Sequence, residues 1–177
     1  MQDEPDRDLL RRFAHGDREA FETLFRQFES EVYRWIVRIV REPTAAEDAL
    51  VEAFWRAYRG RARFDVSRSF GAWMRRIATN AALDHLRTVR PRGTWIVADE
   101  NLPARASPDR SGRDAIMMAF RRLPPKLQVV ATLALIEERP YDEIADALDV
   151  PLGTVKSRVF RAVRALREEL TRLGLQP

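Results

Sequence analysis

Cysteine is absent from this chain of 177 residues, and histidine occurs only twice. Without cysteine there are no disulfide bonds and no thiolate ligands for a metal ion. His15 and His85 lie far apart in the sequence, so we expect no metal site built on imidazole groups. The sequence therefore predicts a protein that needs neither a metal nor another cofactor.

Long apolar segments are also missing. The longest apolar run, residues 129–136, is far shorter than the roughly 20 residues that a membrane-spanning helix needs. The chain begins with MQDEPDRD, which is acidic and polar, unlike a secretory signal peptide. We expect a soluble protein that acts in the cytoplasm and does not insert into a membrane.

Catalytic motifs are missing as well. The sequence has no phosphate-binding loop of the Walker type, no cluster of histidine, cysteine and aspartate, and no serine beside a suitable base. We therefore expect no enzyme and no catalytic residues. The charge balance points elsewhere, since 31 lysines and arginines against 27 acidic residues give a formal net charge of +4. A polyanionic partner fits this balance, although charge alone does not identify one.

Apolar residues recur at helical spacing along nearly the whole chain, and the alternation typical of strands is scarcely present. The sequence therefore predicts an all-α protein. Gly16 and Pro43 mark joints between helices, and Thr44 followed by Glu47 matches a capping box that opens a helix. The helices expected before the last one cover residues 6–14, 18–41, 44–58, 70–87, 114–123, 126–136 and 141–148.

Residues 91–113 differ in composition from the rest of the chain. They are rich in proline, glycine, serine and charge, and they lack helical period. A structureless run of this length is unusual inside one compact domain. We therefore expect two small helical domains, residues 1–92 and 114–177, joined by a flexible linker over residues 93–113.

Residues 139–170 predict a helix-turn-helix. The first helix covers residues 141–148, and the turn is Asp-Val-Pro at residues 149–151, where proline cannot extend the first helix but fits the start of the next. The apolar side expected for the second helix consists of Val155, Val159, Ala162, Val163, Leu166 and Leu170. This layout is typical of domains that place a helix in the major groove of DNA.

The other side of this second helix is basic. It carries Ser157, Arg161 and Arg164, flanked by Thr154, Lys156, Arg158 and Phe160. Arginine reads guanine with two hydrogen bonds, and a phenylalanine ring or a threonine methyl contacts the methyl group of thymine. We expect these residues to bind DNA. The alternative is a solvated helix whose charges form local ion pairs.

The helix expected at residues 44–58 has two contrasting sides. The side expected to be buried holds Leu50, Val51, Phe54, Ala57 and Tyr58. The other side carries a line of charges with a tryptophan beside it, namely Asp48, Glu52, Arg56 and Trp55. Either the charges form a helix-stabilising pair between Glu52 and Arg56, or the exposed tryptophan beside carboxylates anchors a partner protein.

The helix at residues 70–87 and the loop before it mix cations with aromatic residues. Arg76 and Asn80 are one turn apart, and an arginine and an amide at this spacing can act together on nucleic acid. The preceding segment adds Arg61, Arg63, Phe64, Arg68 and Phe70. Proteins that bind single strands use cations to hold phosphates and aromatic rings to stack on unpaired bases. A solvated basic surface above core aromatics explains the same pattern at least as well.

Four segments, in order, resemble the extracytoplasmic-function (ECF) group of alternative bacterial sigma factors. AEDALVEAFWRAY at residues 46–58 resembles region 2.2, and SFGAWMRRIATNAALDHLR at residues 69–87 resembles regions 2.3 to 2.4. LPPKLQVV at residues 123–130 resembles the start of region 4, and residues 141–166 resemble region 4.2. A lone helix-turn-helix is a weak match, but four motifs in order at matching intervals are specific.

The resemblance implies a protein that binds core RNA polymerase and directs it to promoters. The clamp helices of the beta-prime subunit are expected to bind Asp48, Glu52, Trp55 and Arg56, and the beta flap is a further expected contact of core polymerase with this chain. The melted minus-10 element is expected to bind Phe64, Asp65, Arg68, Ser69, Arg76 and Asn80. The duplex minus-35 element is expected to bind Thr154, Lys156, Ser157, Arg158, Phe160, Arg161 and Arg164. The family also implies an anti-sigma factor that covers these faces.

Three places depart from the family pattern. Val51 stands where glutamine is frequent, and Asp149 stands where glycine is common in the turn. Glu-Arg-Pro at residues 138–140 replaces the more usual Gly-Leu-Ser before the helix-turn-helix. None of these departures removes a motif.

The rival hypothesis is a one-component regulator, whose first domain senses a ligand or dimerises while the helix-turn-helix binds an operator. That hypothesis predicts a dimer that binds DNA tightly without polymerase. A sigma factor instead gains promoter affinity by tethering two weak DNA-binding domains to one polymerase. Gel filtration and DNA binding without polymerase separate the two hypotheses.

Overall fold

The computed structural model describes residues 4–88 and 108–175. These residues form helices and the turns between them, without a strand, which confirms the predicted all-α class. No helix within these two ranges is long and apolar enough to cross a membrane. The elements are α1 (Arg7–Ala14), α2 (Arg18–Val40), α3 (Pro43–Gly60), η1 (Arg61–Arg63), α4 (Phe70–Thr88), α5 (Pro108–Arg122), α6 (Pro125–Ala131), η2 (Thr132–Ile136), α7 (Tyr141–Leu148) and α8 (Leu152–Arg172).

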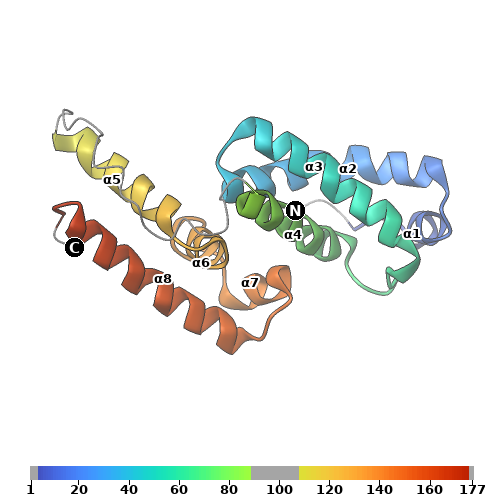
Figure 1. Ribbon diagram of the computed structural model, residues 1–177. Helices are drawn as coiled ribbons and strands as arrows, with labels where there is room; N and C mark the ends of the chain where they lie inside the picture. Colours follow the sequence, from blue (N-terminus) through green and yellow to red (C-terminus); the bar gives the residue numbers. More distant parts are fainter. Residues whose placement is uncertain (1–3, 89–107, 176–177) are drawn as a thin grey trace.

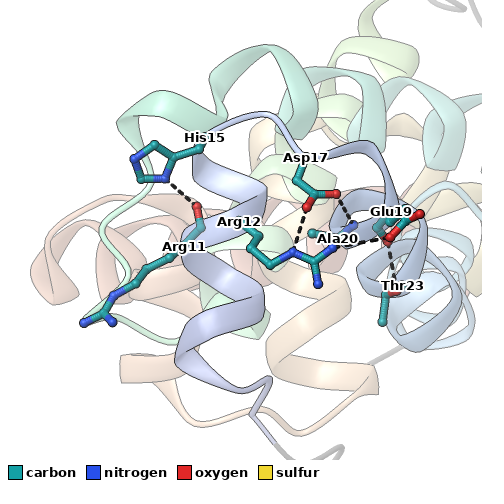
Figure 2. A network of polar contacts seen from close by, with 7 residues as sticks. All are labelled: Arg11, Arg12, His15, Asp17, Glu19, Ala20 and Thr23. Carbon is teal, nitrogen blue, oxygen red and sulfur yellow. Dashed lines mark hydrogen bonds and ion pairs between the residues drawn. The ribbon is translucent and has the colours of Figure 1, made fainter.

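The joint between α1 and α2 is held by one carboxylate. Asp17 caps α2, because its Oδ1 accepts the backbone N–H of Ala20 at 3.1 Å, and its Oδ2 accepts Nε of Arg12 at 2.7 Å (Figure 2). The hydrogen bond from Arg12 lowers the pKa of Asp17. Gly16 has φ +91, and a Cβ there would lie 3.0 Å from the Arg61 side chain. The corner therefore requires glycine followed by a capping residue.

The start of α3 differs from the predicted capping box. The capping side chain is Glu42, whose carboxylate accepts the backbone N–H groups of Thr44 at 2.9 Å and Ala45 at 2.6 Å. Pro43 occupies the first position of the helix, where its missing N–H costs nothing. The prediction that Thr44 and Glu47 open the helix was therefore wrong, because the proline moved the first turn one residue earlier.

The first half of the chain packs α2, α3 and α4 against one another, with α1 across one end (Figure 1). An aromatic cluster closes that end, and it contains Phe13, Phe64, Phe70 and Trp73. Val51, which we expected in the core, has 66% of its surface exposed. Its neighbours Leu50 and Phe54 provide the apolar contacts of that turn of α3, so Val51 belongs to the outer face of the helix.

The second half differs from the prediction at both of its early helices. α5 begins at Pro108 rather than at residue 114, because proline at the first position favours the start of a helix. Residues 108–113 of the predicted linker are therefore helical. The part of that linker at residues 93–107 lies outside the described residues. The expected helix at residues 126–136 is α6 followed by a wider turn, in which the N–H of Glu137 reaches the carbonyl of Thr132 at 3.0 Å.

α5 and α8 lie side by side and are held by their own small core (Figure 1). This core contains Ala119, Phe120, Leu123, Ala131, Ala162 and Leu166. Glu169, which is 8% exposed, forms ion pairs with Arg122 and with Arg172, the latter at 3.1 Å. The buried carboxylate therefore has a partner on each helix.

The two halves are packed together through α4. One apolar cluster continues from the first half into α6, α7 and the start of α8. α4 contacts both α7 and α6. The sequence predicted two helical domains and a linker but gave no contact between the domains, and the structure places one face of α4 against the second unit.

Candidate nucleic-acid interface

The helix-turn-helix has the predicted boundaries for its first helix and its turn. Asp149 ends α7 in the left-handed conformation, with φ 53 and ψ 51. The N–H of Val150 bonds to the carbonyl of Ala145 at 3.1 Å, and Pro151 precedes α8, whose Thr154 N–H reaches the Pro151 carbonyl at 2.8 Å. Aspartate tolerates this backbone conformation better than most residues, although glycine does so without strain.

α8 buries most of the side that was expected to be buried. Val155, Val159, Ala162 and Leu166 are at most 7% exposed, and they pack against α6, α7 and α5. The packing of Val163 and Leu170 is only partial, and the charged residue Glu169 is also buried. One face of the helix is thus fixed to the domain and the other faces outward.

The outward side of α8 carries the predicted DNA-binding residues. The exposed members are Lys156, Ser157, Phe160, Arg161 and Arg164, and the half-buried ones are Thr154 and Arg158. Phe160 has 71% of its surface in solvent. Arg164 pairs with Glu168 at 2.9 Å, whereas within the described ranges Lys156, Arg158 and Arg161 form no ion pair. Three cations and one aromatic ring therefore project from the first turns of α8.

The aromatic residues of the loop before α4 are buried and anchor the loop. They do not face the solvent. Phe64 is 7% exposed, and its ring lies 5.5 Å from that of Phe70 and 4.8 Å from that of Trp73. Phe70 is 1% exposed. Of the two interpretations that the sequence left open, the structure therefore favours core aromatics, because both rings are buried in the core. Arg61 is also engaged, since its guanidinium lies 4.3 Å from the centre of the Tyr58 ring.

The polar residues of this loop hold its shape. Asp65 accepts hydrogen bonds from the Ser67 hydroxyl at 2.7 Å and from the Ser67 N–H at 2.9 Å, and the hydroxyl contact is the main cause of its lowered pKa. Arg68 extends from the loop with its Nε 3.5 Å from Asp65. Ser69 caps α4, since its Oγ accepts the N–H of Ala72 at 3.2 Å.

One residue at this end was missed by sequence reasoning. Glu4 accepts the N–H of Phe70 at 3.1 Å and the hydroxyl of Ser69. Its carboxylate thus lies at the positive end of α4, where a negative charge is favourable. No local sequence signal links two segments so far apart along the chain.

Arg76 and Asn80 lie on α4 as predicted, but their surroundings differ. Asn80 is exposed, whereas Arg76 pairs with Asp149 of the helix-turn-helix, Nη1 to Oδ2, at 3.3 Å. Between these segments is a cleft of ≈ 770 Å³. Its walls include Arg63, Asp65, Arg68, Trp73 and Arg76 on one side, and Asp146, Asp149, Val150 and Pro151 on the other. The structure therefore brings the loop and α4 together with the turn that precedes α8.

The sequence left two alternatives for the outer face of α3, a stabilising ion pair or an exposed tryptophan beside carboxylates, and the structure contains both. Arg56 bonds to Glu52 at 2.6 Å and to Asp84 of α4 at 2.7 Å, and the contact with Glu52 is the main cause of its raised pKa. Asp48 is exposed. Trp55 nevertheless remains 52% exposed and stacks near Tyr58, with Val51 one turn before it. The result is an apolar patch bordered by carboxylates, which is a composition suited to protein binding.

Two family models match the chain in the order of its two halves. Residues 24–92 match Sigma-70 region 2, and residues 113–166 match Sigma-70, region 4. The relatives include ECF RNA polymerase sigma factor SigW of Bacillus subtilis, 34% identical over 91% of this chain and 94% of that protein. Another is RNA polymerase sigma-H factor of Pseudomonas aeruginosa, 35% identical over 94% of each protein.

Two solved structures share the fold. CnrH, in complex with the cytosolic domain of CnrY, matches with a TM-score of 0.59 and 22% identity over 94% of this chain and 97% of that chain. The sigma factor RpoE, in complex with the anti-sigma factor NepR from Bartonella quintana, matches with a TM-score of 0.52 and 20% identity over 85% of this chain and 96% of that chain. The sequence relatives and the two family models together establish that the chain belongs to the ECF group of RNA polymerase sigma factors.

Proposed function

We propose that this sigma factor divides promoter recognition between two domains. These domains are residues 1–92 and residues 114–177, and residues 93–113 join them. As a member of its family it serves promoter-specific initiation by RNA polymerase. The outward side of α8 reads the duplex minus-35 element. The observation that carries this assignment is the exposed Phe160 with Lys156, Arg158 and Arg161 beside it, opposite a side that is fixed in the core. The other proposed contacts are Thr154, Ser157 and Arg164.

The melted minus-10 element binds the first half. The proposed contacts are Asp65, Arg68, Ser69, Arg76 and Asn80, with Phe64 supporting the loop from within the core. The exposed guanidinium of Arg68 and the amide of Asn80 support this assignment, because such groups bond to phosphates and to the edges of unpaired bases. Capture of an unstacked base offsets a melting cost of a few kcal/mol.

Core polymerase binds the outer face of α3 through its beta-prime clamp helices, and its beta flap is a second contact with the protein. The apolar patch of Val51 and Trp55, bordered by Asp48 and Glu52, supports the first contact, with Arg56 fixing Glu52 in place. An anti-sigma factor that covers these faces is a further part of the proposal. A similar fold, RpoE of Bartonella quintana, is known in complex with an anti-sigma factor. All of these partners meet the protein in the cytoplasm.

Replacement of one reading residue tests the assignment. Arg161→Ala should weaken binding at the minus-35 element by about 1–3 kcal/mol and relax base preference at one position. Run-off transcription from a cognate promoter, with single-base variants of the minus-35 element, measures both effects. Arg167→Ala removes the same charge from an exposed position farther along α8 and should leave base preference unchanged. If the two variants behave alike, the reading face has been assigned wrongly.

A further inference from the structure

A small cavity lies where the C-terminal end of α2 meets α5 and α6. Its volume is ≈ 240 Å³, just below the range of about 300–1,000 Å³ that is usual for ligand pockets. Val40 and Arg41 line it from the end of α2, Met117 and Phe120 line it from α5, and Gln128 lines it from α6. None of the residues that line this cavity belongs to the proposed DNA or polymerase contacts. The cavity is therefore separate from the surfaces described above.

Two buried polar atoms of this cavity have no hydrogen-bond partner. Among the residues that the structure describes, Nε of Arg41 and Oε1 of Gln128 are the only buried side-chain nitrogen or oxygen atoms in this state. Both residues line the same cavity, and Gln128 is only 5% exposed. Buried polar groups in native proteins are nearly always paired, because an unpaired one loses its bonds to water without compensation. Two exceptions in one cavity indicate that a bound molecule supplies the missing partners.

The backbone and the neighbours of Arg41 are also unusual. Arg41 ends α2 in the left-handed conformation with φ 58, where glycine is the ordinary residue. Its Nη1 donates to the thioether of Met117 at 3.3 Å, which is a weak acceptor, and within residues 4–88 and 108–175 it forms no ion pair. The adjacent carboxylate of Glu42 is engaged in capping α3. A strained cation without a counterion breaks a local rule, as residues that bind ligands often do.

The polar groups of the cavity define the chemistry of its ligand. The guanidinium of Arg41 is a charged donor, so its best partner is a carboxylate. Oε1 of Gln128 can only accept, so its partner must be a donor. Glu42 also lines the cavity, and its negative charge favours an ammonium group as that donor. Arg121 adds a second guanidinium, so a ligand carboxylate meets two cations and one anion.

The remaining walls add apolar contacts from Val40, Met117 and Phe120. Water can pair with both polar atoms but gains nothing from these side chains. A molecule with a carboxylate and an ammonium on one carbon, and with a short apolar side chain, matches all three features of the cavity.

We propose that this cavity binds an apolar α-amino acid. Its carboxylate accepts from Arg41, its ammonium donates to Gln128, and its side chain lies against the apolar wall. The ligand thus completes the hydrogen bonds of two buried groups that the protein itself leaves unpaired. The inference does not depend on the assigned promoter contacts, and its tests need neither DNA nor polymerase.

Isothermal titration calorimetry of the full chain with L-leucine tests the site. We expect saturable binding with a dissociation constant of about 1 mM or lower. Isocaproate has the same carboxylate and side chain without the ammonium, and isoamylamine lacks the carboxylate. Each analogue should bind at least about tenfold more weakly, because a hydrogen bond to a charged group is lost. Absence of saturable heat with L-leucine, or equal affinity for the three compounds, would overturn the proposal and leave water as the occupant.

Two variants separate binding from folding. Gln128→Met removes the amide but keeps the length of the side chain, and Arg41→Gly removes the guanidinium together with the backbone strain. Both should bind L-leucine at least about tenfold more weakly. Neither should lower the midpoint of thermal unfolding of the ligand-free chain, because each removes an unpaired buried group. Unchanged affinity in either variant, or a lowered midpoint that reveals a purely structural role, would overturn the assignment.

Glu138→Gly is the matched control for Arg41→Gly. It replaces another residue in the left-handed conformation, with φ 50, at a position that does not line the cavity. This control should raise the midpoint of thermal unfolding and leave the affinity for L-leucine unchanged. If it weakens binding as much as Arg41→Gly does, the effect comes from the backbone rather than from the missing guanidinium, and the assignment of Arg41 is wrong.

Discussion

At the residue scale, a few residues adopt a backbone conformation that is unusual for any residue other than glycine. Arg41, Glu138 and Asp149 all have φ between 50 and 58 although none is glycine. Asp149 could be anticipated from the sequence, because a turn before proline was expected there. Glu138 was visible only as a departure from a family pattern that has glycine. Its strain could not be derived from the residue itself, since glutamate gives no signal for a left-handed conformation.

Glu138→Gly should therefore stabilise the protein. Glycine adopts φ near 50 without the clash of a Cβ atom, which costs other residues about 1 kcal/mol or more. The expected gain is about 1 kcal/mol in the free energy of unfolding, reduced slightly by the greater freedom of glycine in the unfolded chain. Urea denaturation measures this gain. Glu138→Ala keeps the Cβ and should gain nothing, so equal stability of the two variants would contradict the explanation.

Phe64 shows how composition can mislead about a single residue. A phenylalanine in a basic loop is typical of single-strand binders, yet this ring lies among Phe13, Phe70 and Trp73. Sequence alone offered both interpretations, and only packing distinguishes them. Long-range contacts such as that between Glu4 and the start of α4 have no sequence signal at all.

Phe64→Ala should lower the free energy of unfolding by about 3–5 kcal/mol, because it leaves a cavity in the aromatic cluster. Thermal unfolding followed by tryptophan fluorescence measures the loss. Phe64→Leu keeps most of the apolar volume and should cost much less. A phenylalanine that stacked on bases from an exposed position would leave stability nearly unchanged in both variants.

At the element scale, helix type and extent were largely predictable. The strong apolar period of α2, α4 and α8 defined these helices, and α7 has the predicted bounds. Boundaries failed where a proline starts a helix earlier than the periodic residues indicate, at Pro43 and Pro108. Periodicity also misplaced Val51, because a residue at the edge of an apolar stripe can belong to either side.

The cap of α3 has a pH dependence that follows from Glu42. Its pKa is lowered mainly because the carboxylate accepts the N–H of Ala45, and also that of Thr44. A lowered pKa means that the ionised cap stabilises the folded state above the usual glutamate pKa of 4.5, and that this stabilisation is lost as the pH falls through the lower folded value. Glu42→Gln should therefore be less stable than the native protein at pH 7.

The difference between Glu42→Gln and the native protein should shrink as the pH is lowered below 4.5, when the native carboxylate is protonated. Thermal unfolding of both proteins over this range measures it. Glu47→Gln, which changes the residue of the predicted capping box, serves as the control and should show no such convergence. A difference for Glu42→Gln that stays constant with pH would contradict the capping role of the charge.

A further prediction at the element scale concerns polymerase binding by the outer face of α3. Asp48→Arg with Glu52→Arg should abolish co-purification with core RNA polymerase, because the changes reverse the charges that border Trp55. Circular dichroism checks that the helices remain. Glu22→Arg with Glu29→Arg makes the same change of charge on α2 and should leave binding intact. Retention of the polymerase by the α3 variant would remove this face from the proposed interface.

At the scale of the whole molecule, the sequence identified two units in the correct order but did not predict how they pack. An apolar stripe predicts that a side chain is buried, but it does not indicate which element that side chain packs against. Thr79, which is fully buried and accepts the indole N–H of Trp35 at 2.9 Å, illustrates the difficulty. The pair lies near the junction of the halves, where Arg139 covers the tryptophan. Such a polar contact becomes visible only when both helices are in place.

Run-off transcription with purified core RNA polymerase on a genomic DNA library is the most direct test of the central claim, that two helical units give one polymerase its choice of promoter. Addition of the chain should produce discrete start sites that core enzyme alone does not use, each preceded by a common pair of elements near minus-35 and minus-10. If the start sites are the same with and without the chain, and the free protein binds an operator tightly as a dimer, the account is contradicted and the one-component regulator is correct.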